Sequence, residues 1–311
     1  MAKFILRRLL ISIPVIFLVA TTTFFIMRLA PGGPFLSERA IPPEIRANLE
    51  AKFGLDQPLW VQYGRYMGNL LRGDLGPSYK YPERTVNQII AEGFPVSLQL
   101  GVAALAFALL VGIPAGVVSA VKHRTFVDYL TMSVVLIGIS IPNFVLGPLL
   151  IFVFSLTLYW FPPGLWGSPG QMVLPSVTLG MLYAVYIARL TRAGMLEVLG
   201  EDYIRTARAK GVGSFRLLWK HALNGSLLPV VSFMGPAVAH LVTGSIVVEK
   251  IFAIPGLGRY FVESAFSRDY TTVMGTVLFY AVLLILANLA VDILYKFMDP
   301  RVEYQSPELT G

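Results

Sequence analysis

Six long apolar stretches constrain the fold of this 311-residue chain more than any other feature of its sequence. A helix that crosses the hydrocarbon layer of a membrane needs about 20 mostly apolar residues. The stretches occupy residues 9–29, 96–120, 127–158, 172–190, 227–248 and 272–297. Because 55% of all residues are hydrophobic and only 14% are charged, the sequence predicts an all-α polytopic membrane protein with six transmembrane helices.

The third stretch allows two interpretations. Residues 127–158 contain Pro142 and Pro148, so the segment is either one long kinked helix or a tight hairpin of two short helices. The choice decides the topology, because a hairpin would move every later segment to the opposite side of the membrane.

The placement of lysine and arginine favours the single kinked helix. Loops on the cytoplasmic side of membrane proteins carry an excess of these residues. With six spans and a cytoplasmic N-terminus, the cytoplasmic segments hold Lys3, Arg7, Arg8, Lys122, Arg124, seven basic residues from Arg189 to Lys220, Lys296 and Arg301. The short outer loop 159–171 holds no basic residue. Both termini are therefore expected in the cytoplasm.

The chain is expected to have four parts. Residues 1–29 form the N-terminal tail and the first span, and residues 30–95 form a small helical extracytoplasmic region whose helices follow proline signals. Residues 96–298 make the transmembrane core of spans two to six, with a cytoplasmic loop at 191–226. Residues 299–311 form a cytoplasmic tail.

Several kinds of chemistry have no signature in the sequence. It contains no G-x-x-x-x-G-K-[S/T] phosphate loop, no H-E-x-x-H zinc motif and no G-x-S-x-G nucleophile elbow. It has no cysteine, which excludes thiolate chemistry and cysteine-bound metals. The net charge of +7 is spread among apolar runs, which favours contact with membrane lipid over nucleic acid. The chain is expected not to be an enzyme and to bind no metal or cofactor.

Ionisable residues inside the predicted spans are rare. Such residues are costly in a membrane and commonly serve proton or ion transport. Asp292 lies one helical turn before Lys296, so a local ion pair explains it better than transport does. His240 lies near the middle of span five, where a hydrogen bond between helices is the simpler explanation and a proton relay the alternative.

A charged segment, "EDYIRTARAKGVGSFRLLWKHAL", separates spans four and five. Helical spacing places Tyr203, Ala207 and Gly211 on one strip, with cations around it. The glycines that follow are expected to break the helix, and Ser214 to cap a second helix that leads to Pro229. The strip favours docking of another protein, whereas the cations alone also suit anionic lipid headgroups.

The segment "YIRTARAKGVGSFRLLWKHALNGSLLPVV" resembles the cytoplasmic loop by which the permeases of ABC importers dock on their ATPases. The general loop begins Glu-Ala-Ala with a glycine four residues later; here Arg205, Thr206 and Ala207 precede Gly211, as in peptide importers. Residues 53–81, 249–270 and the ending "DPRVEY" at 299–304 also resemble the B-type permease subunits of oligopeptide and dipeptide importers.

This resemblance implies a type I ABC importer permease fold and a place in the bacterial inner membrane. The implied partners are a second related permease, two cytoplasmic ATPases that use ATP and Mg²⁺, and an extracytoplasmic peptide-binding protein. The implied ATPase-coupling residues are Tyr203, Ile204, Arg205, Thr206, Ala207, Arg208, Ala209, Lys210 and Gly211.

The expected function is passage of oligopeptides or dipeptides by alternating access. Polar residues of the spans give the expected translocation path: Ser140, Asn143, His240, Thr243 and Ser245. The expected external gate, beneath the docked binding protein, comprises Pro255, Gly256 and Gly258. A related importer for nickel, glutathione or another small solute is one alternative. A stand-alone secondary transporter and a membrane enzyme that uses His240 or Asp292 are the others.

Overall fold

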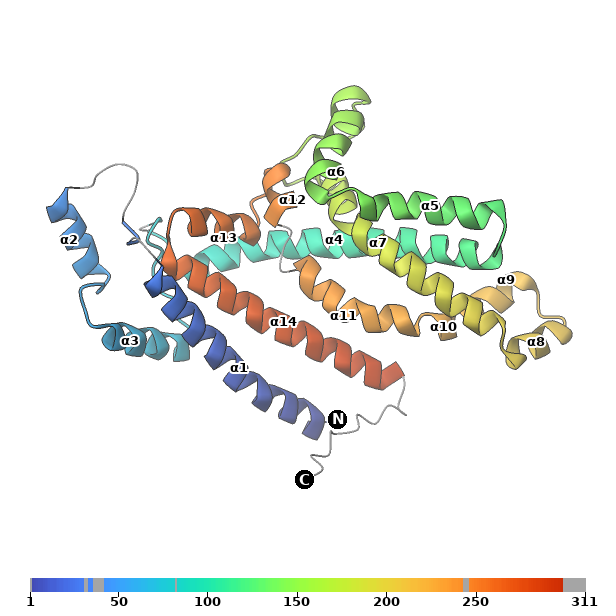
Figure 1. Cartoon of the computed structure of the whole chain (residues 1–311), viewed down its shortest axis with the longest axis horizontal. Helices are drawn as coiled ribbons and strands as arrows, with labels where there is room; N and C mark the ends of the chain where they lie inside the picture. The colour runs from blue at the N-terminus through green and yellow to red at the C-terminus, as the bar shows by residue number, and fades with distance from the viewer. Residues whose placement is uncertain (1, 31–32, 36–41, 82, 243–245, 299–311) are drawn as a thin grey trace. The chain divides into compact units, whose positions relative to one another are not determined.

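The computed structural model describes residues 2–30, 33–35, 42–81, 83–242 and 246–298. These residues form helices and one isolated β-bridge, between Pro77 and Thr85, with no strand among them. In chain order the helices of Figure 1 are α1 (Ala2–Leu29), α2 (Pro43–Lys52), α3 (Leu59–Leu71), α4 (Val86–Val121), α5 (Phe126–Ser140), α6 (Asn143–Leu150), η1 (Ile151–Thr157), α7 (Pro169–Leu199), α8 (Asp202–Ala209), α9 (Ser214–Arg216), η2 (Leu217–Ala222), α10 (Leu223–Ser226), α11 (Leu228–Val242), α12 (Ile246–Ile251), α13 (Leu257–Phe266) and α14 (Tyr270–Met298). The prediction of an all-α protein is confirmed.

Four helices of the described part are long and apolar enough to cross a membrane: α1, α4, α7 and α14. They coincide with predicted spans one, two, four and six. Predicted span five corresponds to α11, which is shorter, and residues 243–245 after it lie outside the described part. The helices indicated after Pro42-Pro43 and Pro58 are α2 and α3.

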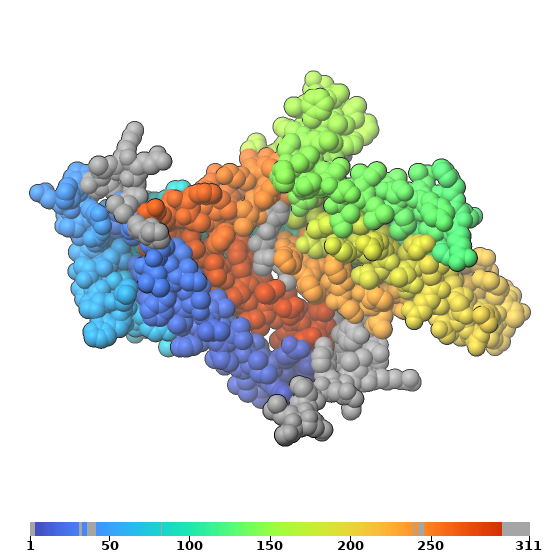
Figure 2. Space-filling view, in the orientation of Figure 1, coloured from blue at the N-terminus to red at the C-terminus, as the bar shows by residue number. Residues whose placement is uncertain are grey.

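Predicted span three is divided into two helical pieces. α5 ends at Ser140, and the α6–η1 segment turns away from it by 106°. Pro142 causes the break, because its ring forces the preceding Ile141 into an extended conformation. Figures 1 and 2 show the α6–η1 segment projecting from α5. The break lies at the first of the two prolines, and its angle far exceeds that of a kinked helix.

The chain divides into two compact units. Unit 1 comprises Met1–Gln99, Gly164–Trp166 and Thr243–Ile285, and unit 2 comprises Leu100–Pro163, Gly167–Val242 and Leu286–Gly311. The core of unit 1 includes Val86, Ile89 and Ile90 of α4, which pack with Leu257 of α13. All four are buried, so the start of α4 is held against α13 by apolar contact.

One carboxylate, that of Asp269, joins two segments of unit 1. Asp269 is 1% exposed and caps α14 by accepting hydrogen bonds from Thr272 N (3.2 Å) and Thr272 Oγ1 (2.7 Å). It also accepts hydrogen bonds from Ser78 Oγ and from the amide nitrogen of Tyr79 (3.0 Å). The sequence offered no physical explanation of Asp269; the structure shows that it fixes the loop before α4 to the start of α14.

Unit 2 is built on the close approach of α4 and α7. Gly112 and Gly116 of α4 face Ala184 and Ala188 of α7: a side chain at Gly112 would lie 2.7 Å from the Ala184 carbonyl oxygen. Gly180 of α7 in turn faces the Ala104 carbonyl. Small residues four apart let two membrane helices approach at backbone distance. The two helices therefore touch through their backbones.

A buried ion pair fastens the turn between α4 and α5 to α7. Asp128 is 2% exposed and accepts two hydrogen bonds from the Arg192 guanidinium, from Nε and Nη2, both at 2.9 Å. Ser119 Oγ donates to Asp128 Oδ1, and the Arg124 amide donates to Asp128 Oδ2 at 3.0 Å. Bidentate pairs of this kind are the strong ones. The pair therefore holds together the end of α4, the start of α5 and the last part of α7, which are the ends expected in the cytoplasm.

Replacement of Gly112 by alanine should destabilise the chain. The new methyl group would meet the Ala184 oxygen and the Ile187 side chain within 3 Å, so we expect a loss of about 1–3 kcal/mol in the free energy of unfolding. Gly64→Ala in α3 is the matched control, because no residue in the described part of the chain lies within 4 Å of its added carbon; helix propensity predicts a gain of about 0.5–1 kcal/mol. Denaturant unfolding in detergent measures both. Equal effects of the two substitutions would contradict close packing at Gly112.

A double-mutant cycle on Asp128 and Arg192 should reveal strong coupling. Asp128→Asn alone leaves a cation without its partner, and we expect it to cost about 2–3 kcal/mol of unfolding free energy. The Asp128→Asn/Arg192→Gln double variant should lose less than the sum of the two single variants, by about 1–3 kcal/mol. Additive losses would show that the pair does not hold the turn. The exposed pair Arg46–Glu50 is the control, and its coupling should be below about 1 kcal/mol.

Candidate functional site

The predicted docking helix is α8, and its end is defined by a glycine joint. The Gly211 amide donates to the Arg208 oxygen (3.0 Å) and the Val212 amide to the Ala207 oxygen (3.2 Å). This pair of bonds is the Schellman motif that closes many helices. Gly211 has a φ of +76°, which other residues rarely adopt. The joint predicted at Gly211 is therefore present.

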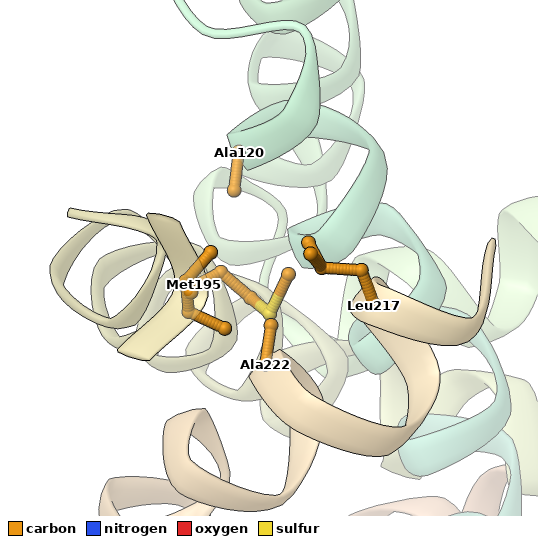
Figure 3. Close-up of a cluster of buried hydrophobic side chains, with 5 residues drawn as sticks. Ala120, Met195, Leu217 and Ala222 are labelled. Atoms are coloured by element: carbon orange, nitrogen blue, oxygen red, sulfur yellow. The ribbon is translucent and has the colours of Figure 1, made fainter. Parts of the chain in front are cut away.

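Ile204 anchors α8 in the core of unit 2. It is 1% exposed and packs with the buried residues Ala120, Met195, Leu217 and Ala222. Figure 3 shows these four side chains converging from three separate segments: Ala120 from α4, Met195 from α7, and Leu217 with Ala222 from η2. Burial of a side chain of this size contributes about 1.5–3 kcal/mol. Ile204 therefore acts as the inner attachment of the helix.

The other predicted coupling residues lie mostly on the outside of α8. Tyr203 is half exposed and its hydroxyl donates to the His221 oxygen at 3.3 Å, while Arg205 pairs with Asp202 at the surface. The rest of the exposed set is Thr206, Arg208, Ala209, Lys210 and Gly211. Ala207 is half-buried against the Ile204 cluster, so the chain itself covers part of the predicted small-residue strip. Figure 2 shows α8 and α9, in golden yellow, at the surface of unit 2.

The second short helix continues into α11. Helical structure runs from Ser214 through α9, η2, α10 and α11 with a single turn residue, Leu227. The prediction that Ser214 caps this helix is wrong: Gly213 occupies the cap position, and Ser214 is already helical. Pro229 lies in the first turn of α11, as predicted, where its missing N–H costs nothing. The second part of the loop is thus a nearly continuous helical path that leads into α11.

A second contact fixes this path to α7. Gly194 of α7 lies so close to Ser226 of α10 that an added side chain would overlap the Ser226 carbonyl oxygen. Ser226 is fully buried. Because α7 precedes α8 and α10 precedes α11, the contact joins both ends of the loop. The two ends of the loop are therefore packed directly against each other.

The residues predicted for the translocation path are only partly placed. Ser140 and Asn143 flank the break between α5 and α6; Ser140 is exposed and its hydroxyl donates to the Leu136 oxygen at 3.2 Å. His240 lies near the end of α11 and is exposed. Thr243 and Ser245 lie outside the described residues. Ser140 and Asn143 are thus brought together at a helix break.

Two of the three predicted gate residues, Gly256 and Gly258, lie against the carboxylate of Glu249, which the sequence analysis did not identify. Gly256 and Gly258 are buried, and a side chain at either would meet the carboxyl group of Glu249 within 3.0 Å. Glu249 is fully buried and accepts hydrogen bonds from Ser97 Oγ (2.7 Å) and the Arg259 amide (3.1 Å). Pro255 is exposed. The two glycines therefore make room for Glu249 at the start of α13, whereas Pro255 faces outward.

Two family models match the sequence. Residues 112–304 match the binding-protein-dependent transport system inner membrane component, and residues 1–101 match the N-terminal part of such membrane components. In the solved structures, an inward-facing form of the MetNI methionine ABC transporter has a similar fold, with a TM-score of 0.58 and 23% identity. The match covers 68% of this chain and 97% of that chain. The predicted importer permease fold is therefore confirmed.

Full-length relatives are more similar. The chain is 49% identical to the oligopeptide transport system permease protein OppB of Salmonella typhimurium, across 98% of this chain and 100% of the relative. It is 46% identical to the dipeptide transport system permease protein DppB of Bacillus subtilis, across 97% and 98%. The chain therefore belongs to the binding-protein-dependent transport system inner membrane components, in the group of OppB- and DppB-type permeases.

Proposed function

We propose that this chain is the membrane permease subunit of an ATP-driven importer and passes oligopeptides or dipeptides into the cell by alternating access. The observation that carries the proposal is how residues 203–211 are attached to the rest of unit 2. Ile204 holds α8 in the core of unit 2, the other side of the helix is exposed, and the following helical path enters α11. The relatives OppB and DppB supply the substrate class.

The proposed mechanism places the energy source outside this chain. A partner ATPase binds ATP and Mg²⁺ and moves with its nucleotide cycle, and the exposed surface of α8 follows it. The path from Ser214 to α11 then transmits the displacement to the membrane helices. Its backbone contact with α7 at Gly194 makes the transmission stiff. The permease needs no ATPase site of its own.

The proposed assembly contains four kinds of protein. This chain pairs with a second related permease, two cytoplasmic ATPases bind beneath them, and an extracytoplasmic peptide-binding protein docks on the other side. In this arrangement both termini and α8 lie in the cytoplasm, and residues 30–95 lie outside the inner membrane. Residues 96–298 form the core of the passage, and residues 299–311 the tail.

The passage itself is proposed to bind peptides weakly. Its candidate lining residues Ser140 and Asn143 are uncharged, whereas a peptide carries two charged ends. Selection is then left to the binding protein. A related importer for nickel, glutathione or another small solute is the second candidate, because the same permease design suits any solute that a binding protein delivers.

Gly211→Arg should detach the ATPase. None of the described residues lies within 4 Å of a carbon added at Gly211, so a long cationic side chain there would project toward the docked partner. Gly211→Asn is the matched control, because asparagine tolerates the left-handed conformation. In affinity purification from mild detergent we expect at least a tenfold loss of co-purified ATPase for the arginine variant and less than a threefold loss for asparagine.

The second permease should still co-purify with both variants, which shows that the membrane assembly has formed. Retention of the ATPase by Gly211→Arg would contradict docking at this surface. Equal loss with both variants would attribute the effect to the helix end and would also count against the proposed contact.

Liposomes should separate the importer from a secondary transporter. Vesicles that hold only this chain and its partner permease should take up no tripeptide under a proton or sodium gradient. Addition of the ATPases, ATP and the binding protein should start uptake. Gradient-driven uptake by the permeases alone would refute the proposal. Heavy-isotope tripeptide inside the vesicles, measured by mass spectrometry, gives the readout.

A further inference from the structure

Unit 1 contains a cavity that the transport proposal does not use. It has a volume of about 210 Å³, many times the roughly 10–15 Å³ that a single water molecule needs. Its walls come from the end of α1, from α3, from the loop before α4 and from the start of α14. Four of its lining residues are aromatic: Phe24, Phe53, Tyr66 and Tyr79. Phe24 stacks on Tyr66 with ring centroids 5.5 Å apart.

Three buried polar atoms of this cavity have no hydrogen-bond partner among the described residues. They are Arg28 Nε, Gln62 Oε1 and the Tyr66 hydroxyl. Buried polar groups are almost always paired, and an unpaired one loses its hydrogen bonds to water without replacement. Burial raises the pKa of Tyr66 to about 12, so its hydroxyl keeps its proton and can donate. Three unpaired groups on one cavity indicate a ligand that has hydrogen-bonding atoms.

The charges of the lining residues specify an anion. Arg28, Lys52 and Arg65 line the cavity, against a single carboxylate, that of Asp74. Asp74 is already engaged, because its Oδ1 accepts the Gly76 amide at 2.9 Å. A guanidinium presents a planar set of donors that fits phosphate oxygens. A phosphate group therefore satisfies the surplus positive charge and the two unpaired donors, Arg28 Nε and the Tyr66 hydroxyl.

The surface beside the cavity is apolar. Arg28 lies in the last turn of α1, a candidate membrane span whose most apolar window is only 11% buried. Phe25, Ile26 and Leu29 of this turn are 39%, 60% and 76% exposed. Figure 2 shows the exposed side of α1 in dark blue. A ligand with a charged head and apolar tails would place its head in the cavity and its tails along α1.

We propose that this cavity binds the phosphate of a phospholipid headgroup, with Arg28 and the Tyr66 hydroxyl as donors and with the acyl chains along α1. Arginine near the end of a span commonly reaches toward the membrane interface, where lipid phosphates lie. The bound lipid would fix the end of α1 to α3. The proposal concerns lipid binding alone and stands apart from the transport function.

Native mass spectrometry of the full chain, purified with its co-purifying subunits and stripped of lipid, tests the proposal. The probes are phosphatidylglycerol, the diacylglycerol with the same acyl chains, and inorganic phosphate. We expect phosphatidylglycerol to bind and diacylglycerol not to bind. Arg28→Gln should weaken phosphatidylglycerol binding at least tenfold and Tyr66→Phe about threefold. Arg72→Gln is the matched control, because Arg72 is an exposed cation at the end of α3 that does not line the cavity.

Equal phosphatidylglycerol binding by the wild type and by Arg28→Gln and Tyr66→Phe would overturn the proposal. Binding of inorganic phosphate without binding of the lipid would overturn it as well, because the site would then recognise a free anion. Binding of diacylglycerol equal to that of phosphatidylglycerol would also overturn the proposal, because the apolar surface alone would then hold the lipid. Tyr66→Phe removes a single hydroxyl, so it keeps the test valid if Arg28→Gln fails to assemble.

Discussion

The backbone contact between α4 and α7 is the constraint on which unit 2 depends. Glycines at 112, 116 and 180 remove the side chains that would separate the two helices. At this distance Arg192 of α7 reaches the carboxylate of Asp128, and Ala120 and Met195 can share one cluster with Ile204. The position of the proposed coupling loop therefore depends on the contact between α4 and α7. The loop has a defined position because α4 and α7, against which Ile204 packs, approach each other closely.

The proposed coupling helix, α8, presents two different surfaces within eight residues. Ile204 is buried in the core of unit 2, whereas Arg208 and Lys210 are exposed. A helix that was fully packed could not engage a partner, and one without an anchor could not transmit force. The glycine joint ends α8 at Gly211, and helical structure resumes at Ser214 and leads into α11. In the proposed mechanism, the exposed side of this short helix serves docking and its buried side serves transmission.

Much of the fold could be predicted from the sequence, because apolar length, proline and glycine act locally. These signals gave the long helices, a distortion of the third stretch at its prolines and the joint at Gly211, but not the division of that stretch into two helical pieces. They did not give Asp128 and Arg192, which lie 64 residues apart, or Glu249, which packs beneath two glycines. The spacing of Gly112 and Gly116 was a usable signal for the helix contact. The angle of the α5–α6 break depends on tertiary packing, and local sequence does not encode it.

The carboxylate of Asp269 has a further consequence. It accepts hydrogen bonds from amide and hydroxyl groups of two segments about 190 residues apart in the chain, so both segments share one buried acceptor. Loss of this one side chain would weaken the start of α14 and the loop at Ser78 together, and the bond from the Thr271 hydroxyl to the Pro77 oxygen would remain as a direct link between them. A substitution at this single position would therefore disturb two segments that are distant in the sequence.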